Sequence, residues 1–349
     1  MNKGIFFIPI YNKNFPLDQI MEEIHENCIK AERNNINEVF FGEHITDKFE
    51  KISSSLMMVS MFSKITKKIK LATLTTNLNF YHPSILAALI SQADNASKGR
   101  LILGIGSGAN LSDIEVIENL GKNNHALMLE SYGIIKKLLY QNNTILKFKT
   151  KNFKVTNQKT FNEKLGLGYF NKLYKSRKNL EIIMPVLGEN SYNLKICAQN
   201  NWSIVISNFC SQSLVEHHIS KYLEYSSLSR TKALKKIKLS RTIFLTESGK
   251  ESKKYLLKNN SPFLFLNKVI FNKLKTFSKN SCFGGSKNYI EATKDTVLHG
   301  SMKDINNYLD KLNNKFKGEL SSLIYTSVPK TKYKIYNNSL DIFCKSLKV

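Results

Sequence analysis

Four short polar loops in this sequence carry side chains that could do chemistry. They are Gly42-Glu43-His44, Thr75-Thr76-Asn77, residues 104–110 and residues 188–191. Each follows a run of apolar residues with the length of a buried strand. If these strands run parallel, their carboxyl ends lie at one end of the fold and the four loops meet there. We therefore expect one site built from all four loops.

The histidine of the first loop is the candidate for proton transfer. His44 has the acidic neighbour Glu43 and precedes the polar residues Thr46, Asp47 and Lys48. Imidazole ordinarily titrates near neutral pH, so a histidine at a strand end suits general acid–base chemistry. A hydrogen-bonded structural histidine is the alternative, and the residues by themselves favour neither interpretation.

The other loops indicate a bound ligand. Residues 104–109 match G-x-G-x-x-A, the dinucleotide fingerprint, but βα units precede the motif and a helix follows it, so the pattern alone is weak. Its glycines would also let the backbone approach a flat cofactor closely. Glu189, Asn190 and Ser191 open a predicted helix, where they can cap it or present free backbone N–H groups to a phosphate.

Apolar segments of strand length alternate with longer amphipathic segments along the chain. The candidate strands span residues 4–9, 38–41, 69–75, 101–105, 181–186, 203–207, 239–245 and 321–325. Segments with helical periodicity lie between them, at 17–33, 84–96, 127–140 and 305–312. This alternation predicts an α/β fold with a parallel sheet, and the number of strands favours a (β/α)8 TIM-like barrel.

The barrel is expected to form a single domain over residues 1–349. Two stretches interrupt the alternation, one at 142–179 and one at 258–299, and neither shows a clear periodicity. Segments of this length inside a compact domain are typical of functional loops or lids. We predict that both are insertions in the barrel.

The composition excludes several classes of protein. The net charge is +25, but only five of the 52 basic residues are arginine, the residue suited to phosphate and base recognition. The lysines are scattered along the chain, so we interpret them as solvated surface and expect no nucleic-acid partner. No apolar run approaches the roughly 18 residues of a membrane span. The five cysteines form no C-x-x-C pair, so we expect no metal site and a reducing cytoplasm.

The order and spacing of the motifs resemble the bacterial luciferase-like flavin monooxygenases. The motifs are A-E-R-N-N-I-N-E-V-F-F-G-E-H, K-I-K-L-A-T-L-T-T-N-L-N-F-Y-H-P and S-K-G-R-L-I-L-G-I-G-S-G-A-N, and they resemble the limonene-monooxygenase-like branch more than the light-emitting subunits. The resemblance implies a TIM-like barrel that receives reduced FMN from a separate NAD(P)H:flavin reductase. It further implies that O2 is used to oxygenate a small organic substrate, an aldehyde, a ketone or a terpenoid-like molecule. Relatives commonly dimerise, so a homo- or heterodimer is expected.

The resemblance also assigns roles to single residues. His44 matches the family's catalytic histidine. The residues that match its cofactor-binding positions are Leu74, Thr75, Ser107, Gly108, Glu189, Asn190 and Ser191. Leu74-Thr75 is the dipeptide, often linked by a cis peptide bond, that supports the isoalloxazine ring, and the last three residues form the phosphate-binding helix start. Where light-emitting relatives have arginines near the phosphate, this sequence has Ser107 and His125.

Two other functions remain open at this stage. One is a hydride-transfer oxidoreductase that uses a deazaflavin, as in a related branch of the fold. The other is a flavin-binding or regulatory subunit without catalysis.

Overall fold

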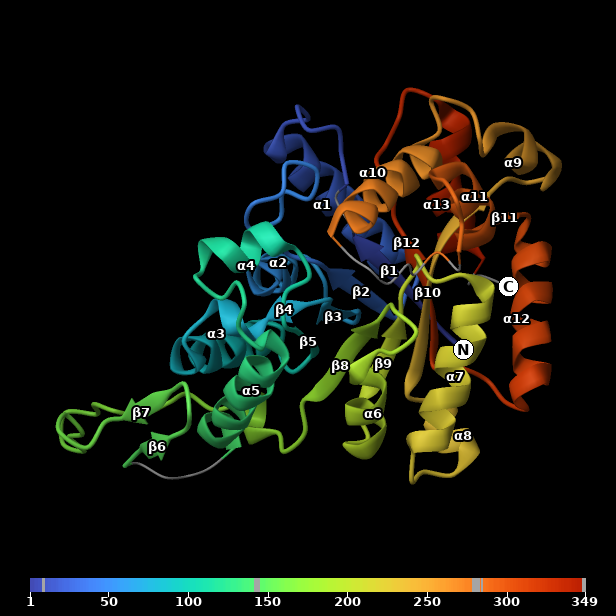
Figure 1. Ribbon diagram of the computed structural model, residues 1–349. Coiled ribbons are helices and arrows are strands. Elements are labelled where there is room, and N and C mark those ends of the chain that lie inside the picture. The colour runs from blue at the N-terminus through green and yellow to red at the C-terminus, as the bar shows by residue number, and fades with distance from the viewer. Residues whose placement is uncertain (8–9, 141–144, 278–282, 284, 347–349) are drawn as a thin grey trace.

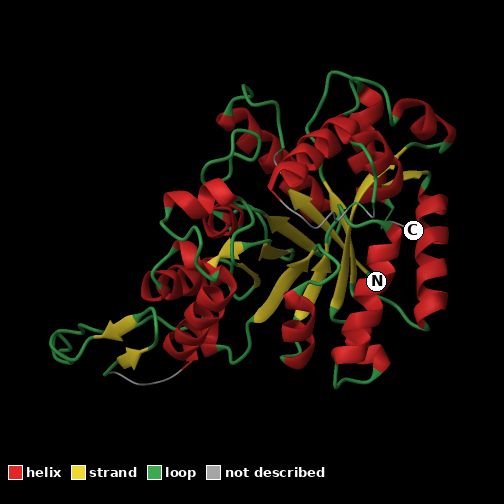
Figure 2. Cartoon of the chain, in the orientation of Figure 1, coloured by secondary structure: helices red, strands yellow, loops and turns green. Residues whose placement is uncertain are grey.

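A computed structural model describes residues 1–7, 10–140, 145–277, 283 and 285–346 of the chain. Within these residues, eight parallel strands close into a barrel that is surrounded by helices (Figures 1 and 2). Around the barrel the strands are β1 (Asn2–Phe7), β2 (Glu38–Phe41), β3 (Lys70–Thr73), β5 (Leu101–Gly106), β8 (Glu181–Val186), β9 (Ser203–Ile206), β10 (Ile237–Leu245) and β12 (Ser322–Thr326). The predicted (β/α)8 fold is therefore confirmed. Residues 8 and 9, at the end of the first predicted strand, lie outside the described residues.

The barrel closes because the first and last strands pair. β1 lies between β2 and β12, with Gly4 opposite Glu38 on one side and opposite Ile324 on the other. Two short strands extend the sheet at its carboxyl end. β4 (Thr76–Asn77) pairs with the end of β5, and β11 (Val297–Gly300) pairs with the end of β10.

Alternating side chains of each strand fill two separate apolar regions. In β2, Val39 and Phe41 pack outward against the helices, whereas Phe40 points into the barrel. This period of two is what a strand buried on both faces requires. At the amino end of the barrel interior, the ammonium group of Lys238 lies 2.6 Å from the carboxylate of Glu38, and both residues are buried.

Amphipathic helices cover the outer face of the barrel. In chain order they are α1 (Leu17–Arg33), α2 (Ser55–Phe62), α3 (Pro83–Ala96), α5 (Asn124–Tyr140), α6 (Tyr192–Gln199), α7 (Gln212–Tyr225), α8 (Arg230–Leu234), α9 (Lys250–Tyr255), α12 (Met302–Phe316) and α13 (Lys334–Lys345). α1 shows why they form, because Ile20, Ile24 and Cys28 recur every four residues and are all buried. α12 begins with a capping box between Ser301 and Asp304. No helix among the described residues is long and apolar enough to cross a membrane.

The first predicted insertion projects from the side of the barrel. β6 (Lys147–Lys149) and β7 (Lys154–Thr156) form an antiparallel hairpin that extends away from the body (Figure 1). The chain returns through a short 3-10 turn, η2 (Tyr174–Ser176), where Arg177 lies 2.5 Å from the buried carboxylate of Asp94. Residues 142–144 of the predicted insertion lie outside the described residues.

The second predicted insertion contains regular structure that the sequence reading missed. Residues Pro262–Phe277 form the helix α10, and Tyr289–Thr296 form α11. Phe263, Leu266 and Ile270 of α10 recur at helical spacing and are buried, so the sequence holds a helical period that the prediction missed. α10 crosses over the carboxyl end of the barrel (Figure 1), where Leu266 and Ile270 join the interior cluster of Phe6 and Leu74. Residues 278–282 and 284 lie outside the described residues.

Candidate active site

His44 lies at the carboxyl end of β2, held between carboxylates. Its Nδ1 is 2.8 Å from Asp113 Oδ2, and its Nε2 is 3.4 Å from Glu50 Oε2. Asp113 belongs to α4 (Leu111–Val116), the short helix that follows the glycine-rich loop after β5. The same carboxylate accepts hydrogen bonds from the backbone N–H groups of Ile45 and Thr46, which fixes the loop around His44.

These carboxylates decide the charge of His44. Burial alone would lower the pKa of the imidazole, but Glu50 and Asp113 outweigh this effect and raise the pKa of His44 to about 9. At neutral pH the side chain is therefore an imidazolium that donates from Nδ1 to Asp113 and forms an ion pair through Nε2 with Glu50. This differs from the near-neutral titration that the sequence suggested. In this state His44 can give up a proton but cannot accept one.

Glu43 holds three segments of the site together. Its carboxylate accepts hydrogen bonds from the backbone N–H groups of Ser55, at 2.9 Å, and Asn77, at 2.7 Å, and from the Ser55 hydroxyl. Burial raises the pKa of Glu43 despite these donors. The residue thus joins the end of β2, the start of α2 and β4, and its role in the described structure is to position them.

Hydrogen bonds through Asn77 join the loops after β3 and β5. The Leu74–Thr75 peptide bond is cis, as the family resemblance implies. Asn77 Oδ1 accepts hydrogen bonds from the Thr75 hydroxyl at 3.1 Å and from the backbone N–H of Gly108 at 3.0 Å. The predicted ring-binding residues Leu74, Thr75 and Gly108 therefore lie together.

Gly106 permits this close approach between the two loops. A Cβ atom at this position would lie 2.3 Å from Thr75 Oγ1 and 2.8 Å from Asn77 Oδ1, well inside contact distance. Any larger residue would force the loops apart. The glycine motif of β5 thus serves the packing of the site.

The predicted phosphate-binding residues lie on both sides of His125. Ser107 Oγ is 3.4 Å from His125 Nδ1, and the His125 ring packs edge-on against Tyr192, the first residue of α6, with ring centroids 4.7 Å apart. Ser191 is the N-cap of α6 but makes no side-chain cap hydrogen bond, and Glu189 and Asn190 precede it on the surface. The structure thus brings Ser107 and the start of α6 together.

The residues around His125 fit a phosphate group. His125 Nε2 and Asn193 Oδ1 are buried atoms that reach no third residue in the described part of the chain, and the two side chains interact with each other. The first-turn N–H groups of a helix have no acceptor within the helix and favour an anion. Burial lowers the pKa of His125, so its ring is uncharged at neutral pH and would contact a phosphate as a neutral donor.

The helix α10 closes the site from above. Lys273 forms ion pairs with Asp47 and with Glu50, whose oxygen lies 2.8 Å from the ammonium nitrogen. Phe265 of the same helix packs near Phe49, with ring centroids 6.4 Å apart. Because Glu50 also faces His44, one carboxylate links the covering helix to the histidine.

Sequence reasoning did not find Asp113, Glu50 or Lys273. Asp113 follows His44 by 69 residues, and Lys273 follows Asp47 by 226. Only the closure of the barrel brings them together. The position of Asp113 just after the glycine-rich loop was the one available signal, since that loop was already placed at the site. Among the described residues, no group of histidine, cysteine and acidic side chains could hold a metal ion.

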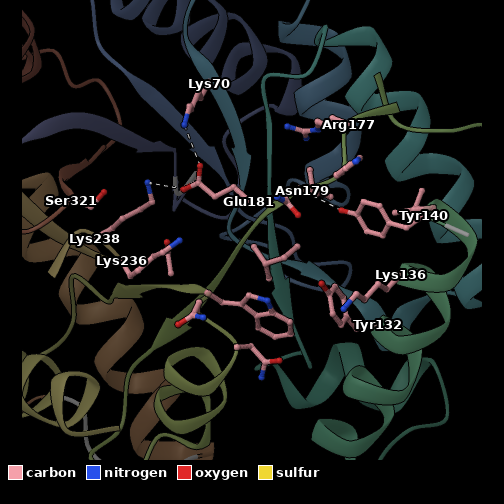
Figure 3. A pocket seen from close by; sticks show the side chains of 18 of the residues that line it. Lys70, Tyr132, Lys136, Tyr140, Arg177, Asn179, Glu181, Lys236, Lys238 and Ser321 are labelled. Carbon is pink, nitrogen blue, oxygen red and sulfur yellow. Dashed lines mark hydrogen bonds and ion pairs between the residues drawn. The ribbon is translucent and has the colours of Figure 1, made fainter. Parts of the chain in front are cut away.

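A large cavity lies at the opposite end of the barrel. It has a volume of about 1310 Å³ and is lined by residues from the amino ends of the strands, including Glu38, Lys70, Glu181 and Lys238 (Figure 3). In (β/α)8 barrels the amino end serves stability, and catalytic groups lie at the carboxyl end. We therefore place the candidate active site at His44 and consider this cavity separately.

Comparison with known proteins supports the family resemblance. Residues 3–162 match the family model described as luciferase-like monooxygenase, which confirms the resemblance inferred from the sequence motifs. Limonene 1,2-monooxygenase of Rhodococcus erythropolis is 26% identical over 140 residues, which are 39% of this chain. The matched segment spans only 35% of that relative's length.

The fold is also shared with solved structures over nearly the whole chain. The oxygenating constituent of 3,6-diketocamphane monooxygenase from Pseudomonas putida, solved in complex with FMN, superposes with a TM-score of 0.81 at 19% identity, covering 99% of this chain and 98% of that one. The coenzyme F420-dependent tetrahydromethanopterin reductase of Methanopyrus kandleri superposes with a TM-score of 0.64 at 15% identity, covering 99% and 97%. At these identities the likeness establishes the fold alone.

Proposed function

We propose that the protein is a flavin-dependent monooxygenase that uses reduced FMN and O2 to oxygenate a small organic substrate. The observation that carries the proposal is the convergence of three sets of residues at one barrel end. His44 with Asp113 forms a proton-donating pair, Thr75 and Gly108 are held together through Asn77 where a flat ring would lie, and the His125 region is a place for a phosphate. The match of residues 3–162 to the luciferase-like model supports this reading.

The bound flavin would supply two electrons and activate O2. One oxygen atom would enter the substrate and the other would leave as water. The protein would contribute the geometry and a proton. His44 is charged at neutral pH, so its Nε2–H is the group from which a proton can move to a developing anionic oxygen. Asp113 keeps the ring oriented through Nδ1 while the proton leaves from the other nitrogen.

The phosphate end of the site favours FMN over a flavin without a phosphate. His125 Nε2, which interacts only with the side chain of Asn193 among the described residues, and the α6 amides would gain a charged acceptor when a phosphate binds. The substrate we infer is an aldehyde, a ketone or a terpenoid-like molecule, because the relatives named above act on limonene and diketocamphane. Reduced FMN would come from a separate NAD(P)H:flavin reductase.

A deazaflavin-dependent hydride-transfer enzyme is the second candidate. The fold shared with the coenzyme F420-dependent reductase favours it. A proton donor such as His44 would serve either reaction, and the match of residues 3–162 to the luciferase-like monooxygenase model favours the monooxygenase. Tighter binding of a deazaflavin than of FMN would favour the hydride-transfer enzyme over the monooxygenase.

We also propose that the chain dimerises through α2 and α3. These neighbouring helices expose Met57, Met61, Ile85 and Leu89, whose exposed fractions are 63%, 48%, 59% and 39%. Clustered apolar side chains on a surface mark a protein interface. Light scattering of the wild type and of the Met61→Lys/Ile85→Lys variant tests this, and a wild type that remains a monomer contradicts it.

The proposed function is tested by anaerobic titration with reduced FMN, followed by a pulse of oxygen in the presence of a panel of cyclic ketones, aldehydes and terpenes. We expect saturable binding of reduced FMN, about tenfold tighter than that of reduced riboflavin, since one phosphate contact is worth about 1.4 kcal/mol. His125→Ala should remove this difference without weakening the binding of riboflavin. Failure to bind FMN, or oxidation of the flavin without any oxygenated product across the panel, contradicts the proposal.

A further inference from the structure

The amino end of the barrel carries a groove whose charge the proposed oxygenase reaction does not use. This basal groove is the cavity of about 1310 Å³ between α5, the start of β8 and the segment before β9. A smaller hollow of about 430 Å³, which shares Asn201, Lys235 and Lys236 with it, extends it along α8. The barrel strands separate it from His44 by about 20 Å, since β1 has six residues at about 3.3 Å each.

The lining of the basal groove is strongly basic. Eight of its lining side chains are cations and two, Glu38 and Glu181, are carboxylates. Both carboxylates are already neutralised, because Lys238 contacts both of them and Lys70 lies 3.2 Å from Glu181. The charges on the floor of the groove therefore cancel, and the excess positive charge of the groove lies on its walls.

Three of the wall lysines have no carboxylate of their own. Lys136, Lys178 and Lys236 form no ion pair with any described residue, whereas Arg177 pairs with Asp94 and Lys235 with Glu319. Figure 3 shows Lys136 and Lys236 on opposite sides of the pocket, with other lining side chains between them. Like charges that face one another across a hollow destabilise the empty protein and attract an anion.

Aromatic rings line the same space. Tyr132 and Tyr140 lie beside Lys136 on one wall (Figure 3), and the Trp202 ring packs edge-on against Tyr132 with centroids 4.9 Å apart. The three side chains are only partly buried. Such rings provide surfaces on which a planar base can stack. The amides of Asn179 and Asn201 add donors and acceptors at the edge.

We propose that the basal groove binds a nucleoside phosphate. The unpaired lysines would hold the phosphates and the aromatic wall would hold the base. A single inorganic phosphate would leave most of the volume and all three rings unused, and a cavity of this size accommodates a nucleotide. The site is separate from the flavin site at the other end of the barrel and does not depend on the oxygenase reaction.

The chain offers a direct probe, because Trp202 is its single tryptophan. Flavin-free protein of residues 1–349 is titrated with ADP, and tryptophan fluorescence and calorimetric heat are both recorded. We expect saturable binding with one site per chain. Adenosine, which lacks the phosphates, and inorganic phosphate, which lacks the base, should each bind at least tenfold more weakly than ADP.

Two matched charge-reversal variants separate the groove from general attraction to a basic protein. Lys136→Glu/Lys236→Glu should weaken ADP binding at least tenfold. Lys294→Glu/Lys311→Glu, on exposed positions of α11 and α12, makes the same change of net charge and should leave binding unchanged. Equal weakening in both variants overturns the proposal, as does the absence of heat and of a fluorescence change at millimolar ADP.

A further comparison distinguishes a nucleotide from a nucleic acid. A twelve-residue single-stranded oligonucleotide should bind no more tightly per site than ADP. Binding at least a hundredfold tighter, with a strong dependence on salt, would identify a polynucleotide track and overturn the assignment to a nucleoside phosphate.

Discussion

The two ends of the barrel differ in charge and in how they are covered. At the carboxyl end, His44 lies among Glu50, Asp113 and Asp47, and α10 covers it. At the amino end, the basal groove is open and its unpaired charges belong to lysines. The same eight parallel strands position both sets. A net charge summed over the sequence therefore describes neither end, because the acidic cluster is paired with His44 and Lys273, whereas the basal groove has more cations than carboxylates.

Among the changes proposed here, removal of His44 should have the largest effect on turnover. His44→Ala deletes the proton donor at the carboxyl end, so turnover should fall by about 10² to 10⁴-fold. ADP binding in the basal groove should not change. Steady-state kinetics and calorimetry measure the two effects on one preparation. His25→Ala, on α1, serves as the control and should retain full turnover. A His44→Ala variant with normal turnover would restore the structural interpretation of the residue.

Removal of one carboxylate should alter the pH profile rather than abolish activity. Turnover that needs the imidazolium should persist below pH 9 and decline as pH rises through the pKa of His44, which is about 9. Asp113→Asn keeps acceptors for the backbone of the loop but offers His44 a neutral partner. We expect the decline to move down by about one pH unit and kcat at neutral pH to fall about tenfold or less.

The titration of His44 should also appear in the pH dependence of the free energy of unfolding. The folded state raises the pKa of His44 from 6.5 to about 9, so its contribution is complete below pH 6.5 and is lost as pH approaches 9. Urea unfolding at a series of pH values measures how the free energy of unfolding falls as the pH rises. A stability curve for Asp113→Asn that matches the wild type over this window would show that the pair does not set the charge of His44.

The smallest effect is expected at the covering helix. Lys273→Met removes the ion pairs that join α10 to Asp47 and Glu50 while keeping the apolar part of the side chain. The free energy of unfolding should fall by about 1 kcal/mol, as for a partly exposed ion pair. Flavin should enter and leave faster, which stopped-flow fluorescence measures. Unchanged rates would show that α10 does not limit access to the site.

The sequence predicted more of the fold than of the site's chemistry. All eight barrel strands have a local apolar signature, and the helices α1, α3, α5 and α12 show helical periodicity, whereas α2, α8, α9 and α13 were not predicted. α10 was missed although Phe263, Leu266 and Ile270 recur at helical spacing, since it lies in a long segment that interrupts the alternation of strands and helices. His44, Thr75, Gly108 and Ser107 could be placed because parallel strands bring their loops to one end. The charge of His44 could not be predicted, because it depends on Glu50 and Asp113. Asp113 belongs to a six-residue helix, and contacts from such a short helix leave no periodic signal in the sequence.

The clustering of the lysines in the fold could not be predicted from the sequence. In the sequence they are scattered and resemble a solvated surface. The fold brings Lys136, Lys178 and Lys236 to one groove from three separate segments, next to Trp202 and Tyr132. Clustering that depends on closure of the barrel cannot be read from spacing along the chain.

The most direct test of the proposed function is a single turnover with reduced FMN and ¹⁸O2, with a cyclic ketone or terpene that proves to be a substrate. Mass spectrometry of the product counts the labelled atoms. The account predicts one ¹⁸O atom in each product molecule from the wild type. For His44→Ala it predicts oxidised FMN with little labelled product. Product that carries oxygen from water, or substrate reduced without incorporation of oxygen, would contradict the account.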